Sequence, residues 1–180
     1  MVYVHLAEGF EELEALSVID LLRRVGVEAA LVSVTGEKMV RGAHGINIEA
    51  DILFEDADYE KCIMIVLPGG LPGTFGLRDH EGLCAKIQEF AAAGKRISAI
   101  CAAPLVFGEL GVLEGREATI YPGMEVNLKG AKPVNDAVVK DGNIITSQGP
   151  GTAMYFALAI AEELCGRQVA EDLRKDLILK

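Results

Sequence analysis

The chain has 180 residues, a length that fits one compact domain covering residues 1–180. Hydrophobic residues make up 51% and charged residues 24%, which is typical of a globular protein and excludes a disordered or collagen-like chain. Lysine and arginine number 17 against 27 aspartate and glutamate residues, so the formal net charge is −10. This charge argues against nucleic acid as a partner.

The apolar stretches and the cysteines predict the compartment. The longest apolar runs, such as Ala153–Ala161, are shorter than the roughly 20 residues that cross a bilayer, so we expect no membrane partner. The first residues carry no basic region, which predicts no secretory signal and a cytoplasmic location. The cysteine spacing fits neither a zinc site nor a disulfide framework, and we expect reduced thiols at Cys62, Cys84, Cys101 and Cys165.

The first predicted elements form a β-α-β unit. Val2–Ala7 predicts a strand, Glu11–Val25 an amphipathic helix that stops at a glycine, and Val27–Val34 a second strand. A right-handed crossover makes these two strands parallel. Met39–Ile52, interrupted by two glycines, favours an antiparallel excursion at a sheet edge.

The alternation of strands and helices continues through the rest of the chain. We predict strands at Ile63–Leu67, Arg96–Ile100 and Glu117–Tyr121, helices at Glu81–Ala93 and Ala102–Leu110, a hairpin within Ala137–Ser147, and a very apolar helix between Gly149 and Cys165. Strands alternating with helices predict an α/β sandwich, in which helices cover both faces of a mostly parallel sheet.

The junction Ile97–Pro104 carries the strongest chemical signal. A predicted strand runs directly into a helix with Cys101 at the corner, which resembles a nucleophile elbow with cysteine in place of serine. A helix N-terminus would stabilise the thiolate through its dipole and free amides. The alternative is an inert thiol that fills a small buried space.

Two other strand-to-helix turns could complete a site around Cys101. The glycines of Pro68-Gly69-Gly70 allow close approach, and the amides of Gly70 and Ala102 could form an oxyanion hole, although a plain turn is the simpler interpretation. Glu14 lies in an acidic helix start beside the predicted apolar face. If it is buried, its carboxyl would be protonated near neutral pH and could hydrogen-bond a thiolate.

All three histidines, His5, His44 and His80, precede Cys101. A Cys-His-Glu triad in which the histidine follows the cysteine therefore cannot be built. We expect His5 to be a satisfied strand residue and His80 to lie near a helix start.

Four segments resemble the DJ-1/ThiJ/PfpI superfamily in order and spacing: AEGFEELEA (7–15), VLPGG (66–70), AICAAP (99–104) and TSQGPGT (146–152). The resemblance favours the DJ-1/ThiJ branch, because Ala102 stands where the protease-like branch has a histidine. It implies a flavodoxin-like three-layer sandwich and a homodimer with its active sites near the interface. At that interface His44 falls where several relatives carry arginine.

The resemblance also implies roles for particular residues. Cys101 becomes the nucleophile, Glu14 the protonated carboxyl that hydrogen-bonds it, and Gly70 and Ala102 the amide donors. Tyr121 stands where the best-known members carry a histidine. A phenol with a pKa of about 10 can donate a hydrogen bond but is a poor general base at neutral pH.

The resemblance implies a cysteine-dependent enzyme that acts on small reactive dicarbonyls such as methylglyoxal, or on their adducts, as a glyoxalase or deglycase. This chemistry needs neither a metal nor an organic cofactor. The alternative is an oxidative-stress sensor or chaperone-like protein that uses reversible oxidation of Cys101. A peptidase has little support, because neither Ala102 nor any later residue supplies the base.

Overall fold

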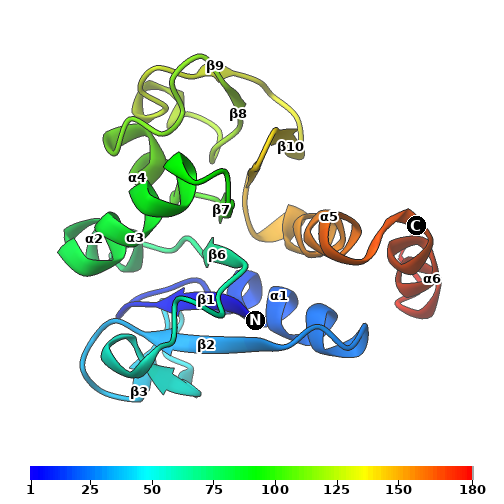
Figure 1. The fold of residues 1–180 in the computed structure, drawn as a ribbon, viewed down its shortest axis with the longest axis horizontal. Coiled ribbons are helices and arrows are strands. Elements are labelled where there is room, and N and C mark those ends of the chain that lie inside the picture. The colour runs from blue at the N-terminus through cyan, green and yellow to red at the C-terminus, as the bar shows by residue number, and fades with distance from the viewer. Residues whose placement is uncertain (180) are drawn as a thin grey trace.

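A computed structural model describes residues 1–179, and a seven-stranded sheet lies at its centre (Figure 1). The strand order is β10-β11-β7-β6-β1-β2-β5, and every neighbouring pair is parallel except β10 with β11. The strands are β1 (Val2–Leu6), β2 (Ala29–Ser33), β5 (Ile52–Leu53), β6 (Met64–Leu67), β7 (Arg96–Ile100), β10 (Val138–Asp141) and β11 (Ile144–Ser147).

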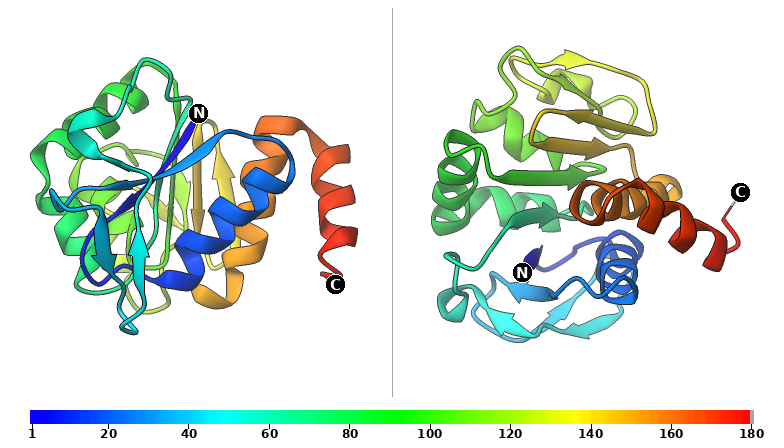
Figure 2. Two further views of the ribbon diagram at one scale, coloured as in Figure 1. Left: turned by 90° about the horizontal axis from the view of Figure 1, so that it is seen from below. Right: turned by 45° about the vertical axis from the view of Figure 1, so that its right-hand side comes forward.

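Helices cover both faces of this sheet (Figure 2). One face carries α1 (Glu12–Arg24) and α5 (Ala153–Cys165), and α6 (Arg167–Asp176) packs on α5 at the periphery. The other face carries α2 (Gly73–Asp79), α3 (Glu81–Ala92) and α4 (Pro104–Glu109). The predicted flavodoxin-like sandwich is therefore confirmed.

The central strand β1 is mostly apolar because all five of its positions are buried, and His5 is the residue that departs from this pattern. Val2, Val4 and Leu6 belong to the core under α1 and α5, whereas Tyr3 belongs to the core under α3 and α4. A parallel strand covered on both faces has no solvent side, so a continuous apolar run replaces the alternation of a half-exposed strand.

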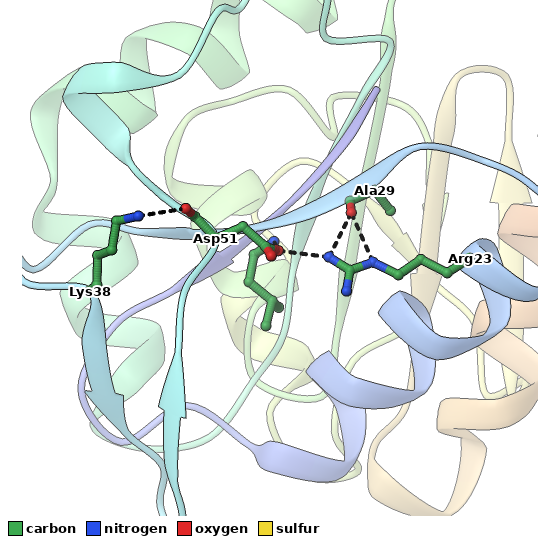
Figure 3. A network of polar contacts seen from close by, with 5 residues as sticks. Arg23, Ala29, Lys38 and Asp51 are labelled. Carbon is green, nitrogen blue, oxygen red and sulfur yellow. Dashed lines mark hydrogen bonds and ion pairs between the residues drawn. The ribbon is translucent and has the colours of Figure 1, made fainter.

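The predicted excursion at 39–52 divides into two parts. Strands β3 (Met39–Arg41) and β4 (Asn47–Glu49) pair antiparallel in a small sheet of their own, and β5 then joins the edge of the main sheet parallel to β2. Asp51 anchors this junction (Figure 3): its carboxylate accepts hydrogen bonds from Arg23 Nη2 (2.7 Å) and Leu31 N (2.8 Å), and its carbonyl accepts one from Lys38 Nζ (2.9 Å).

The predicted strand Glu117–Tyr121 is wrong in length and place. Only β8 (Glu117–Ala118) forms, and it pairs with β9 (Lys132–Pro133) outside the central sheet. The next amides have other acceptors, since Thr119 N donates to Thr146 Oγ1 (2.9 Å) and Tyr121 N donates to the carbonyl of Cys101 (2.9 Å). The segment therefore reaches the candidate site without a β ladder.

Other boundaries differ more modestly. The helix predicted from Ala102 begins at Pro104. The helices α2 and α6 were not predicted from the sequence. The 3-10 helices are η1 (Phe54–Asp56), η2 (Glu125–Asn127) and η3 (Pro150–Thr152). Within residues 1–179, none of the helices combines the length and apolar character needed to span a membrane.

Candidate functional site

Cys101 occupies the corner between β7 and α4 in a conformation that few side chains adopt. Its φ angle is 63°, in the left-handed region. Two backbone hydrogen bonds hold it there, because Cys101 N donates to Ser147 O (3.0 Å) and Cys101 O accepts from Tyr121 N (2.9 Å). Strain at a residue that two neighbouring segments fix in this way is a recurrent feature of functional sites.

Glu14 lies beside Cys101 and is completely buried. It comes from the first turn of α1, and its Oε2 accepts a hydrogen bond from Gly69 N at 2.7 Å. Its other oxygen, Oε1, is buried with no hydrogen-bond partner among residues 1–179. A buried carboxyl with an unpaired oxygen is more stable with a proton than as an anion.

The two acids control each other's ionisation. Burial raises the pKa of Glu14 to about 7, against the lowering effects of the Gly69 amide and the Cys101 thiol. Burial and the negative charge of Glu14 raise the pKa of Cys101 to about 12, although the amides of Gly70 and Ala102 lower it. The pKa of the Cys101 thiol is thus raised, whereas the sequence predicted that a helix N-terminus would stabilise the thiolate and lower this pKa.

One proton therefore leaves the pair near neutral pH, because a second ionisation would bring two negative charges together in a buried site. These pKa values place the remaining proton mainly on the Cys101 thiol, and the Glu14 carboxylate can accept it. When it sits on Glu14, Cys101 is a thiolate and faces the amides of Gly70 and Ala102. That tautomer is the nucleophilic one.

The loop after β6 reaches Cys101 only because it contains two glycines. A Cβ on Gly69 would lie 2.6 Å from the Cys101 Cβ and 2.9 Å from Glu14 Oε2. Gly70 has a φ angle of +88°, and its Cβ would lie 2.5 Å from both Glu11 N and Gly9 O. The sequence singled out this double glycine for its close approach, but it did not predict the hydrogen bond from Gly69 N to Glu14.

A pocket of about 380 Å³ opens above the thiol. Its lining includes Gly70, Leu71, Cys101, Ala102, Tyr121 and Met124. Tyr121 is 48% exposed, and its ring lies close to Gly149. The structure thus brings together all five residues that the sequence singled out, with four lining the pocket and Glu14 beneath Cys101.

The model of the DJ-1/PfpI family matches residues 1–163. The chain belongs to this family. Drosophila melanogaster Protein dj-1beta is 38% identical over 98% of this chain and 95% of its own length. Caenorhabditis elegans Glutathione-independent glyoxalase DJR-1.2 is 33% identical over 96% of this chain and 92% of its own length. By contrast, the chain spans only 40% of Arabidopsis thaliana Protein DJ-1 homolog B.

Solved structures of DJ-1 proteins share the fold closely. The crystal structure of Drosophila DJ-1beta aligns with a TM-score of 0.95 at 38% identity, covering 99% of this chain and 97% of that one. An oxidised Toxoplasma gondii DJ-1 aligns with a TM-score of 0.94 at 36% identity, covering 98% and 97%. The resemblance inferred from four short motifs therefore extends along nearly the whole chain.

This DJ-1/PfpI member has no histidine among the residues that line the Cys101 pocket. His5 is buried in β1 with Nε2 at 2.8 Å from the Tyr59 hydroxyl, and burial lowers its pKa to about 3. His80 caps α3, with Nδ1 accepting from Leu83 N at 3.0 Å. Both placements agree with the sequence prediction, and neither histidine is available as a base for Cys101.

The other cysteines are not part of the pocket. Cys62 is buried, and burial raises the pKa of its thiol to about 11. Cys84 and Cys165 are partly buried, and all four cysteines are free, as the sequence predicted. Among them Cys101 alone combines partial exposure with a pocket.

Proposed function

We propose that this DJ-1/PfpI protein is a cysteine-dependent enzyme that converts small reactive dicarbonyls, such as methylglyoxal, into hydroxy acids. The observation that carries the proposal is the position of Cys101 between a buried carboxyl with a pKa of about 7 and two backbone amides, at the base of an open pocket. The relative named as a glutathione-independent glyoxalase supports the same chemistry.

In the proposed reaction, the Cys101 thiolate attacks the aldehyde carbon of methylglyoxal and forms a hemithioacetal. The amides of Gly70 and Ala102 stabilise the negative charge that develops on the aldehyde oxygen. Glu14 protonates this oxygen, and its carboxylate then carries the proton of the former aldehyde carbon to the neighbouring ketone carbon through an enediol. Water hydrolyses the resulting thioester, which releases lactate and regenerates the Cys101 thiol.

Tyr121 has a binding role in this proposal. Its half-exposed ring lines the pocket, so its phenol can donate a hydrogen bond to a substrate oxygen. Glu14 then performs the proton transfers alone, because no imidazole lines the pocket. The reaction requires no cofactor.

The test is methylglyoxal consumption and lactate formation by the purified, reduced protein, compared with Cys101→Ser. We expect many turnovers in the wild type and none in Cys101→Ser. Cys84→Ser is the matched control, because it removes a partly buried thiol outside the pocket and should keep full activity. If the wild type consumes no more than one equivalent per chain, the protein is not a dicarbonyl enzyme.

The second candidate function is an oxidation sensor in which Cys101 is reversibly oxidised. The partial exposure of Cys101 and the similarity to an oxidised DJ-1 structure favour it. Intact-mass measurement after limited peroxide would detect oxygen added at Cys101. A modification that occurs once per chain, without dicarbonyl turnover, would support the sensor.

Three further properties complete the proposal. We expect one domain over residues 1–180, because strands from both halves of the chain form one central sheet. We expect a homodimer, as the family resemblance implies, which light scattering after size-exclusion chromatography would test. The free thiols favour a reducing compartment, and we propose the cytoplasm.

A further inference from the structure

The pocket over Cys101 has a lining that is apolar apart from the reactive groups. Among residues 1–179, no aspartate, glutamate, histidine, lysine or arginine lines it, and its largest side chains are Leu71, Tyr121 and Met124. A charged group of a substrate would therefore find no partner of opposite charge there, and an anion would also meet a chain of net charge −10. This lining favours neutral ligands.

Leu71 keeps its side chain half exposed, although the loop that carries it is tightly packed. Before Leu71, a Cβ on Gly70 would lie 2.5 Å from Gly9 O and Glu11 N. After it, a Cβ on Gly9 would lie 2.5 Å from Pro72 Cδ. These backbone contacts hold the loop, while 51% of Leu71 stays exposed at the pocket. Burial in the core of this chain therefore does not explain an apolar side chain at this position.

Tyr121 and Met124 add a second apolar surface to the same pocket. Tyr121 N donates to Cys101 O (2.9 Å), and Tyr121 O accepts from Met124 N (3.0 Å), so this turn is fixed next to the nucleophile. The Tyr121 ring lies over Gly149, where an added Cβ would be 3.3 Å from its Cδ2. A single exposed apolar side chain is ordinary, whereas several that line one pocket beside a reactive thiol are typical of a ligand site.

The pocket is also larger than methylglyoxal requires. Its volume of about 380 Å³ falls in the range of pockets that hold small organic ligands, about 300–1,000 Å³. Methylglyoxal has only a methyl group beyond its carbonyls, so it would leave most of this apolar surface in contact with water. A phenyl ring in place of the methyl group would cover more of that surface and gain the corresponding binding free energy.

We propose that this pocket selects neutral dicarbonyls with an aromatic substituent, such as phenylglyoxal, over methylglyoxal, and that Leu71 determines the preference. The inference rests on the proposed dicarbonyl function and adds the substrate class. The aldehyde lies at Cys101, and the aromatic ring packs against the Leu71 side chain and the edge or face of the Tyr121 ring. The reaction is otherwise unchanged, since phenylglyoxal and water give mandelate.

The first experiment measures ligand preference without turnover. Iodoacetamide alkylates Cys101 in the full chain, as it assembles in solution, and peptide mass spectrometry follows the protection by acetophenone, acetone or benzoate. Acetophenone and acetone lack an aldehyde, and benzoate carries the same ring with a negative charge. We expect acetophenone to give half-protection at a concentration at least about tenfold lower than acetone or benzoate. Equal protection by acetophenone and acetone, or stronger protection by benzoate, would overturn the proposal.

Three variants assign the preference to Leu71. Leu71→Asn keeps a branched side chain of similar size but makes it polar, so the advantage of acetophenone over acetone should fall at least about fivefold. Leu71→Met keeps an apolar side chain and should retain the advantage. The matched control is Ile63→Asn, the same kind of change at a residue that is 43% exposed at the opposite end of β6 and outside the pocket. Far-UV circular dichroism checks that each variant is folded.

The second experiment compares kcat/KM for phenylglyoxal and methylglyoxal, measured as mandelate and lactate formation. The two aldehydes differ in intrinsic reactivity, so the ratio of their kcat/KM values is compared between variants. This ratio should be at least about fivefold lower in Leu71→Asn than in the wild type and unchanged in Ile63→Asn. An unchanged ratio in Leu71→Asn would overturn the role of Leu71. Absence of turnover with both aldehydes would refute the proposed enzyme, whereas the protection experiment would still decide whether the pocket prefers an aromatic ring.

Discussion

The burial of Glu14 should make the stability of the fold depend on pH in a way that one substitution removes. Glu14→Gln keeps an oxygen that can accept the hydrogen bond from Gly69 N and has nearly the same shape, but it cannot ionise. In the wild type the unfolded carboxyl loses its proton near pH 4.5, whereas the folded one holds it up to about pH 7. Between these values the folded state binds more protons than the unfolded state, so stability falls as pH rises.

The size of this effect follows from the two pKa values. A carboxyl whose pKa is 4.5 when unfolded and about 7 when folded loses about 3 kcal/mol of stability once the pH exceeds the folded value. From pH 5 to pH 8 the loss is about 2.5 kcal/mol. Over the same interval Glu14→Gln should lack this loss, and the other titrating groups cancel in the comparison.

Urea unfolding at half-unit pH steps from 5 to 8, with reductant present, measures this difference. The free energy of unfolding of Glu14→Gln minus that of the wild type should grow with pH and level off above about 7. The same pair in a Cys101→Ser background should show a similar rise, because burial is the largest cause of the Glu14 shift. Parallel stability curves for the wild type and Glu14→Gln would refute the reasoning.

Two further substitutions, each with a control variant, test the site's geometry and chemistry. Gly70→Ala should destabilise the fold by more than about 2 kcal/mol in urea unfolding, since its Cβ would overlap backbone atoms at 2.5 Å. The control Gly26→Ala has a similar φ angle of +76° but open space around the added Cβ, so it should cost only about 1 kcal/mol. Equal losses of stability in the two variants would contradict the steric argument. Tyr121→His should raise methylglyoxal turnover at least about tenfold and add an inflection near pH 6.5 to the pH profile of turnover. Tyr121→Phe should reduce kcat only modestly. An inactive Tyr121→Phe would show that the phenol does more than bind the substrate.

Much of the fold could be predicted because its central strands have no polar face. Runs such as Ile63–Leu67 and Arg96–Ile100 show their burial directly in the sequence, and the β-α-β order fixes their direction. The segment Glu117–Tyr121 misled the prediction because its middle residues, 118–120, are buried like those of a strand. Its amides bind Thr146 and Cys101 instead of a neighbouring strand, and that choice depends on tertiary contacts.

In the candidate site too, some features could be predicted from the sequence and others depend on tertiary contacts. The corner at Cys101 follows from the local pattern, whereas the position of Glu14 beside the apolar face of a helix left its burial open. The family resemblance supplies the relation between the two residues. The contact of Gly69 N with Glu14 joins residues 55 positions apart, and no periodicity reveals it. Outside the pocket, the contact of His44 Nδ1 with Glu12 Oε2 at 2.9 Å is equally non-local.

The proposed proton transfer and the predicted loss of folding stability at higher pH have the same physical origin, the raised pKa of Glu14. A proton carrier works best when its pKa is near the working pH. Glu14 beside Cys101 meets this condition, and no histidine lines the pocket to serve instead. Glu14 reaches that pKa mainly through burial, and the raised pKa corresponds to about 3 kcal/mol of stability lost when the carboxyl is ionised. A substitution that removed this cost would also remove the proton carrier. A buried carboxyl retained at such a cost is better explained by a proton-transfer role than by packing, which a neutral glutamine would serve equally well.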